Sequence, residues 1–224
     1  MVRRIGFLVT GLGVVLLAWL ALTIWQGDPI TSLYTRYEQH ALTARLATVE
    51  RTWAKRGASL ASVSSTALKT KRAAAVFARS LKDGAPIGRL VIPRLGLNMV
   101  VVEGTTTSDL ERGPGHYDAA SGAATNLPGM GGVIAIAGHR TTFLHPFRHI
   151  DDLRSGDRIT LAMPYGTFRY TVYLHRIVSS TDWSILRRRR YEKLVLSACH
   201  PLYSATHRWI VFARLSSTMQ PSLQ

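Results

Sequence analysis

The sequence is short of cysteine and of acidic side chains. It has one cysteine, Cys199, among 224 residues, so no disulfide can form within the chain. Asp and Glu number 13 against 28 Lys and Arg, which gives a formal net charge of +15 at pH 7. Such a surplus favours anionic partners, whether nucleic acid, anionic lipid or anionic wall polymer.

Several motifs that would narrow the function are also missing. The sequence has no zinc-finger spacing, no P-loop and no aromatic-rich RNA-binding motif, so a nucleic-acid partner is not expected. His200 directly follows Cys199, but no Cys-x-x-Cys or His-Glu-x-x-His spacing accompanies it. We therefore expect neither a metal site nor a cofactor.

One long apolar run is present near the N-terminus. Residues 5–25 carry no charge, and about 20 such residues suffice for a helix to cross a bilayer. A signal peptide has a shorter apolar core and a small-residue cleavage site, and a soluble core helix is rarely apolar on all sides. Arg3 and Arg4 precede the run, so the positive-inside rule places residues 1–4 in the cytoplasm. We expect a single-pass plasma-membrane protein that contacts lipid through residues 5–25, with the rest of the chain outside.

The next segment, residues 26–85, has the pattern of two helices. Apolar residues at helical spacing predict one helix from Thr31 to about Arg56 and a shorter, basic one from Leu68 to Leu81. We interpret the segment as an extracellular helical stalk or linker. The alternative is that one of these helices packs onto the folded domain.

Residues 86–216 have the short apolar runs typical of strands. We expect strands at about 87–93, 97–102, 132–138, 159–163, 167–178, 193–199 and 209–215. Seven or eight short strands without regular helical partners predict a mostly β fold that forms a closed or nearly closed barrel. Residues 113–132 are expected to form a long loop, and residues 217–224 a polar tail.

Three residues at the ends of expected strands suggest chemistry. Cys199 ends one apolar run and Arg208 begins the next, so pairing of these strands would bring thiol and guanidinium together. Arginine suits a developing oxyanion, and a thiol needs a basic or cationic neighbour to attack as thiolate. His139 follows a buried strand that ends at Gly138 and is a candidate base. Each residue taken singly is more often structural, and the spacing does not show that His139 reaches Cys199.

Longer motifs around these residues resemble those of a known family. They are AIAGHRTTFLHPFRHIDDLRSGDRI (135–159), LSACHPLYSATHRWIVFARL (196–215) and GPGHYD (113–118). They resemble sortases, most closely the actinobacterial class E group. The resemblance implies a closed eight-stranded β-barrel and a cysteine transpeptidase, with Cys199 as nucleophile, His139 as general acid/base and Arg208 as oxyanion stabiliser.

The same resemblance implies the partners. Substrates would be surface proteins with a C-terminal LPxTG/LAxTG-like sorting signal, cleaved between Thr and Gly through a thioacyl intermediate. A cell-wall peptide amine would be the acceptor. Housekeeping anchoring is favoured over pilin polymerisation, because residues 57–85 contain a single aromatic, Phe77, and the C-terminal end is short and polar. A non-catalytic wall-binding barrel is the alternative from another class.

Two stretches leave questions open. The family often has Thr-Leu-x-Thr before the cysteine, whereas residues 195–198 here are Val-Leu-Ser-Ala. Ala198 is therefore a candidate substrate-binding position that lacks a hydroxyl. Ser197 is not expected to replace it, because neighbouring strand residues face opposite sides. The run Arg187–Arg190 forms either a solvated loop or a contact with wall polymer or substrate.

Overall fold

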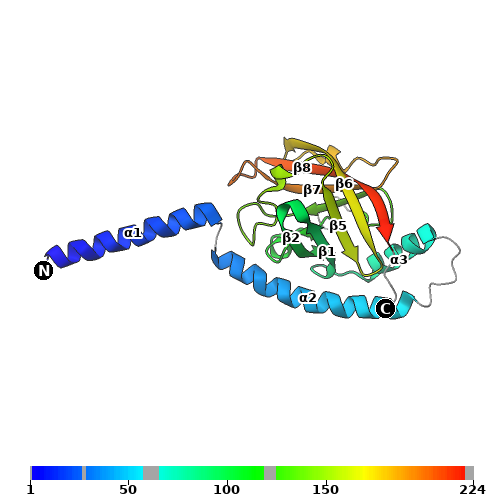
Figure 1. The fold of residues 1–224 in the computed structure, drawn as a ribbon, viewed down its shortest axis with the longest axis horizontal. Coiled ribbons are helices and arrows are strands. Elements are labelled where there is room, and N and C mark those ends of the chain that lie inside the picture. The colour runs from blue at the N-terminus through cyan, green and yellow to red at the C-terminus, as the bar shows by residue number, and fades with distance from the viewer. Residues whose placement is uncertain (1, 27–28, 58–65, 119–124, 220–224) are drawn as a thin grey trace.

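The structure, a computed structural model, describes residues 2–26, 29–57, 66–118 and 125–219 (Figure 1). The α-helices are α1 (Val2–Gln26), α2 (Pro29–Gly57), α3 (Thr66–Ser80) and α4 (Thr107–Leu110), and the 3-10 helices are η2 (Pro93–Leu95), η3 (Ile150–Asp152) and η4 (Trp183–Leu186). The strands are β1 (Pro86–Ile92), β2 (Leu97–Glu103), β3 (Gly115–His116), β4 (Val133–Ala137), β5 (Arg158–Met163), β6 (Gly166–Ser179), β7 (Lys193–His200) and β8 (His207–Met219).

The strands form a closed barrel in the order β1-β2-β3-β4-β7-β8-β6-β5. The expected eight-stranded barrel is therefore confirmed. The pairs β2–β3 and β4–β7 are parallel, and the other pairs are antiparallel. The parallel pair β4–β7 places two strand ends that carry candidate residues at the same edge.

Two boundaries differ from the expectation. The stretch expected as a loop contains β3, in which Gly115 pairs with Val102 on one side and with Ala137 on the other. Two residues are too few to show the alternation of a strand, so this strand can be identified only from its pairing with β2 and β4. Strand β8 continues past residue 216, because Met219 still pairs with Thr167 of β6. The last residues of the expected tail, 220–224, lie outside the described part.

Alternation along the strands creates apolar packing on both sides of the barrel wall. On β7, Leu194, Leu196 and Ala198 belong to the interior core, whereas Val195 packs in a second cluster with Ile210 of β8. Successive strand residues point to opposite faces. The second cluster therefore lies on the outer face of β4, β7 and β8, where Ile185 of η4 covers it.

Helices α2 and α3 pack on the barrel. Leu42 and Leu46 of α2 are buried against Val100 and Val102 of β2, and apolar residues repeat along α2 at helical spacing through Val49 and Trp53. Trp53 and Phe77 of α3 are buried in the main core, with ring centroids 5.3 Å apart. Both helices therefore pack onto the folded domain and do not form a free stalk.

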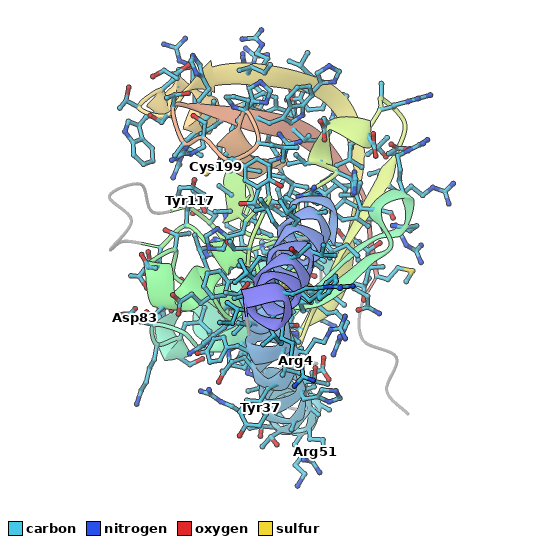
Figure 2. The ribbon with its side chains drawn as sticks, turned by 90° about the vertical axis from the view of Figure 1, so that its left-hand side faces the viewer. Arg4, Tyr37, Arg51, Asp83, Tyr117 and Cys199 are labelled. Atoms are coloured by element: carbon cyan, nitrogen blue, oxygen red, sulfur yellow. The ribbon has the colours of Figure 1, made fainter. Side chains whose placement is uncertain are left out.

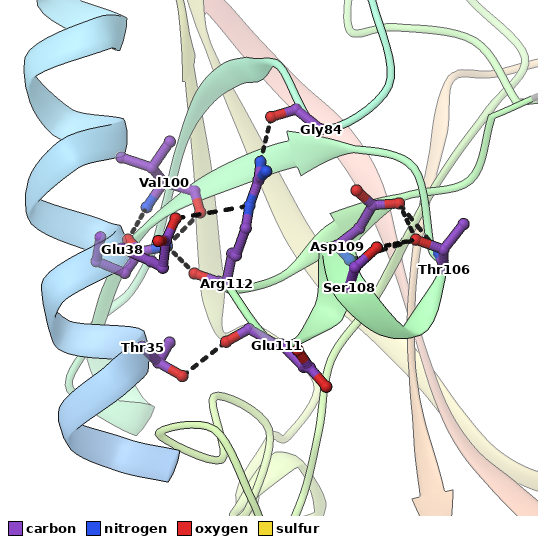
Figure 3. A network of polar contacts seen from close by, with 10 residues as sticks. Thr35, Glu38, Gly84, Val100, Thr106, Ser108, Asp109, Glu111 and Arg112 are labelled. Atoms are coloured by element: carbon purple, nitrogen blue, oxygen red, sulfur yellow. Dashed lines mark hydrogen bonds and ion pairs between the residues drawn. The ribbon is translucent and has the colours of Figure 1, made fainter. Parts of the chain in front are cut away.

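Hydrogen bonds tie α2 to the same face of the barrel (Figure 3). Gln39 Nε2 donates to the carbonyls of Val100 at 3.0 Å and Arg112 at 2.7 Å, and Gln39 Oε1 accepts from Val100 N at 2.8 Å. Thr35 Oγ1 donates to the carbonyl of Glu111 at 2.7 Å. Helix α2 is thus held by directional contacts as well as by apolar packing.

Helix α1 projects away from the barrel (Figure 1). Its segment Arg3–Ala21 is long and apolar enough to cross a membrane, and none of it is buried in the protein. Apolar side chains such as Phe7 and Leu8 are exposed. This exposure is consistent with a lipid-facing helix.

Candidate active site

The fold brings the three candidate residues to the same end of three adjacent strands. Cys199 of β7 pairs directly with Arg208 of β8. Ala137 of β4 pairs with Ser197 in parallel register, and Gly138 N donates to Ser197 O at 3.1 Å. His139 and Cys199 therefore both come two residues after a paired position. Figures 1 and 2 place this strand end and the labelled Cys199 on the side of the barrel away from α2.

Strand alternation sets which face the site occupies. Cys199 is four residues after Val195, and Arg208 is two residues before Ile210, so both share the outer face with that cluster. Cys199 is partly exposed and is a free thiol. A nucleophile on this face is open to a substrate, whereas one on the interior face would be sealed in the core.

Gly138 allows tight packing under His139. A Cβ at Gly138 would lie 2.7 Å from the ring of Phe147, which is fully buried. Phe147 N also donates to the carbonyl of His139 at 3.0 Å. The Phe147 ring thus packs against the backbone at Gly138 and His139 and fixes its position.

The imidazole of His139 is largely withdrawn from water. Its ring lies 5.3 Å from the ring of Phe143, and within the described residues its buried Nε2 has no hydrogen-bond partner. Burial lowers the pKa of His139 below its usual value, and the carboxylate of Glu111 opposes that shift. Nε2 thus has an unused hydrogen-bonding position, which a group that carries protons in catalysis requires.

The loop after His139 has an unusual backbone. Phe143, Leu144 and His145 have φ angles of 53°, 59° and 35°, a left-handed conformation that costs energy for residues with a side chain. Phe143 N donates to Thr31 Oγ1 of α2 at 3.1 Å. Helix α2 therefore helps to hold the loop whose aromatic ring packs on His139.

Arg208 is paired with Cys199 across the two strands, but part of its side chain is hydrogen-bonded to the turn that precedes it. Nη1 donates to the carbonyls of Ala205 at 2.9 Å and His207 at 3.1 Å. The remaining guanidinium donors have no partner among the residues that the structure describes. They are available to an oxyanion beside Cys199.

Ala198 is placed differently from its expected role. Its side chain is 2% exposed and belongs to the interior core, so it points away from the face of Cys199. Ser197, which was expected to face away from the site, shares the face of Cys199 instead. Counted from Cys199, strand alternation itself places Ser197 on the face of the thiol and Ala198 on the opposite face, so the Ala198 side chain does not line the open site.

Sequence reasoning missed Arg140, which directly follows His139. Its side chain is 3% exposed and reaches the end of β7. The signal was the Gly-His-Arg run itself, but a charged residue after a strand is usually solvated. Arg187–Arg190 are exposed and lie beyond the opposite end of β7 from Cys199. No group of three or more metal-ligating side chains occurs in the described ranges.

Comparisons with known proteins agree with this architecture. The model of the sortase domain family matches residues 90–216, more than half of the chain. Sortase D of Bacillus subtilis (strain 168) is 34% identical over 59% of this chain and 65% of its own length. Sortase SrtE1 of Streptomyces coelicolor is 30% identical over 61% of this chain and 42% of its own length. The chain thus spans less than two thirds of these relatives.

A solved structure is similar in fold. The crystal structure of sortase E1 from Streptomyces coelicolor, with a tripeptide in its active site, matches this chain with a TM-score of 0.58 at 27% identity. The alignment covers 64% of this chain and 95% of that one. The expected family is therefore confirmed by sequence and by fold: the chain belongs to the sortase family.

Proposed function

We propose that the protein is a membrane-anchored cysteine transpeptidase of class E type that attaches surface proteins to the cell wall. The observation that carries the proposal is the placement of His139, Cys199 and Arg208 at the same end of β4, β7 and β8, with Cys199 and Arg208 directly paired. Thiol, imidazole and guanidinium together supply a nucleophile, a proton carrier and an oxyanion partner.

The first half-reaction forms a thioester. The thiolate of Cys199 attacks the carbonyl carbon of Thr in a C-terminal LPxTG/LAxTG-like signal, and the carbonyl oxygen becomes an oxyanion that Arg208 stabilises. The Thr–Gly bond breaks, and His139 gives its proton to the departing Gly nitrogen. The protein remains attached to Cys199 as a thioester.

The second half-reaction releases the enzyme. An amine of a cell-wall peptide attacks the thioester carbonyl, and neutral His139 takes the proton that this nitrogen loses. The C–S bond breaks and the thiolate of Cys199 returns. Burial lowers the pKa of His139. The imidazolium is then a better acid for the first step, and the ring that has lost its proton stays neutral for the second.

The proposed location follows from α1. A helix of this length and exposure is consistent with a single-pass anchor, and Arg3 and Arg4 favour a cytoplasmic N-terminus. The barrel would then lie outside the plasma membrane, where sorting signals and wall amines are present.

The test uses the full chain in detergent with a library of sorting-signal peptides. Mass spectrometry of the products identifies the cleaved bond and the acylated residue. We expect cleavage between Thr and Gly and a thioacyl adduct on Cys199. Cys199→Ala, with an unchanged circular dichroism spectrum, should form no adduct.

Two outcomes would contradict the proposal. Peptide processing by Cys199→Ala at the wild-type rate would remove the nucleophile assignment. Failure of a thiol-reactive substrate analogue to label Cys199 in the folded wild-type chain would favour a non-catalytic wall-binding barrel.

A further inference from the structure

Arg140 is a buried cation with all of its hydrogen-bonding capacity in use. Its side chain is 3% exposed. A guanidinium has five N–H donors and no acceptor, and five contacts are present around this one. Burying a charge is costly unless it is paired and hydrogen-bonded, so the surrounding chain is built to receive this side chain.

Three of the five contacts go to the segment that follows His139. Nε and Nη2 both donate to the carbonyl of Arg148, at 3.2 and 3.1 Å, and Nη2 also donates to Asp151 Oδ1 at 2.8 Å. This segment forms the far side of the loop that contains Phe143 and Phe147. Arg140 therefore closes the loop that supports His139.

The other two contacts go to the end of β7. Nη1 donates to the carbonyl of Cys199 at 3.5 Å and to His200 Nδ1 at 3.4 Å. Because a guanidinium cannot accept a hydrogen bond, His200 Nδ1 must be the acceptor and carries no proton. One side chain thus spans from the residue after His139 to the backbone of the nucleophile.

We propose that Arg140 is a positioning residue for the transpeptidation proposed above, which fixes the strand end that carries Cys199 relative to the loop that carries His139. The flat fork of arginine is suited to this task, because its donors leave in fixed directions toward two separate segments. A lysine keeps the charge but offers three donors from a single atom, so it cannot span both segments in the same way.

The central test replaces Arg140 by Lys in the full chain in detergent, with Arg94→Lys as the matched control. Arg94 forms an ion pair with Asp157 at 2.5 Å on another part of the barrel. We expect Arg140→Lys to lower kcat for peptide cleavage by about 100-fold, the scale of an ångström-sized misplacement, with KM changed less than twofold. Arg94→Lys should leave both constants within twofold of wild type.

A second readout reports the site geometry without turnover. The rate at which iodoacetamide alkylates Cys199 responds to a neighbouring imidazole, so His139→Asn should change that rate in the wild-type background. In the Arg140→Lys background, the same His139→Asn change should have a smaller effect. A merely structural role for Arg140 would lower the melting temperature but would not uncouple these two residues.

The outcomes separate this inference from the proposed function. Wild-type kcat in Arg140→Lys, or an equal effect of His139→Asn in both backgrounds, overturns the positioning role alone. Full activity of Cys199→Ala overturns the proposed function itself.

A milder variant covers the case in which Arg140→Lys does not fold. Asp151→Asn removes the charge from an acceptor that is 41% exposed and leaves the other contacts in place. We expect it to lower kcat several-fold at a temperature where the protein is folded. A kcat equal to that of Arg94→Lys would count against the inference.

Discussion

The two outer faces of the barrel are built from the same strand alternation but are used differently. On β2, Val100 and Val102 point outward and are fully covered by Leu42 and Leu46 of α2. On β7, Val195 points outward beneath η4, but the same row of side chains continues to the partly exposed Cys199. The first face is covered at Val100 and Val102, although Asn98 in the same row is exposed, and on the second face the cover stops short of Cys199.

The thiol is therefore exposed because the element that covers its outer face, η4, does not extend as far as Cys199. Outward-facing apolar residues need a cover, and α2 supplies one on the first face. Helix α2 also reaches toward the second face, because Thr31 accepts a hydrogen bond from the loop beside His139. Helix α2, which covers the first face, therefore also helps to hold the loop beside His139 on the second.

The largest expected effect comes from removing the cover. A chain that starts at Lys82 loses Leu42, Leu46, Trp53 and Phe77, and burial of such side chains contributes about 1.5–3 kcal/mol each. The summed loss, on the order of 6–12 kcal/mol, is comparable with the whole stability of a typical domain. We expect this chain to be insoluble or unfolded by circular dichroism, whereas a chain that starts at Pro29 should fold. Equal melting temperatures would show that the helices are a free stalk after all.

The next largest effect concerns the packing of Phe147 against Gly138. Gly138→Ala would place a Cβ 2.7 Å from the Phe147 ring, so the ring or the His139 backbone must move. We expect kcat to fall at least tenfold, because small displacements of catalytic groups are costly. The double variant Gly138→Ala/Phe147→Leu should recover part of this loss. No recovery would mean that the clash is not the cause.

A smaller effect is expected from the charge next to the site. The carboxylate of Glu111 raises the pKa of His139 against the effect of burial. Glu111→Gln should therefore lower the pKa of His139, so that the ring loses its proton at a lower pH. NMR titration of His139 in a Cys199→Ala background measures this without interference from the thiol. Glu38→Gln on α2 is the control, and a shift toward higher pH in Glu111→Gln would contradict the assignment.

The smallest effect tests the link between the two faces. Thr31→Val keeps the shape of the side chain but removes the oxygen that accepts from Phe143 N. An unpaired amide costs about 1 kcal/mol or more, so we expect kcat to fall roughly fivefold with little change in melting temperature. Thr52→Val is the matched control, because Thr52 Oγ1 donates to the carbonyl of Thr48 within α2, at 2.9 Å, and touches no part of the site. Equal effects of the two changes would argue against the link.

The sequence was informative where local pattern decides structure. Apolar runs predicted the longer strands, and helical spacing predicted α2 and α3 close to their observed ends. The family motifs indicated Cys199, His139 and Arg208, and the fold brings these to one edge. None of these inferences required knowledge of which segments meet.

Features that depend on tertiary contact were out of reach. Strand β3 exists because β2 and β4 flank it, and the packing of α2 depends on the outward valines of β2. Ala198 is a different case, because alternation along β7, counted from Cys199, already predicts that its side chain points away from the thiol. Arg140 was missed because nothing local shows that its charged side chain finds four acceptor atoms after folding.

The contact between Thr31 and Phe143 also sets a tether length. Helix α1 ends at Gln26, five residues before Thr31, and five extended residues reach at most about 18 Å. If α1 is the anchor proposed above, Thr31 and the Phe143 amide that it binds would lie within about this distance of the end of the anchor. For the proposed transpeptidase, this short distance favours sorting signals that are still close to the lipid surface.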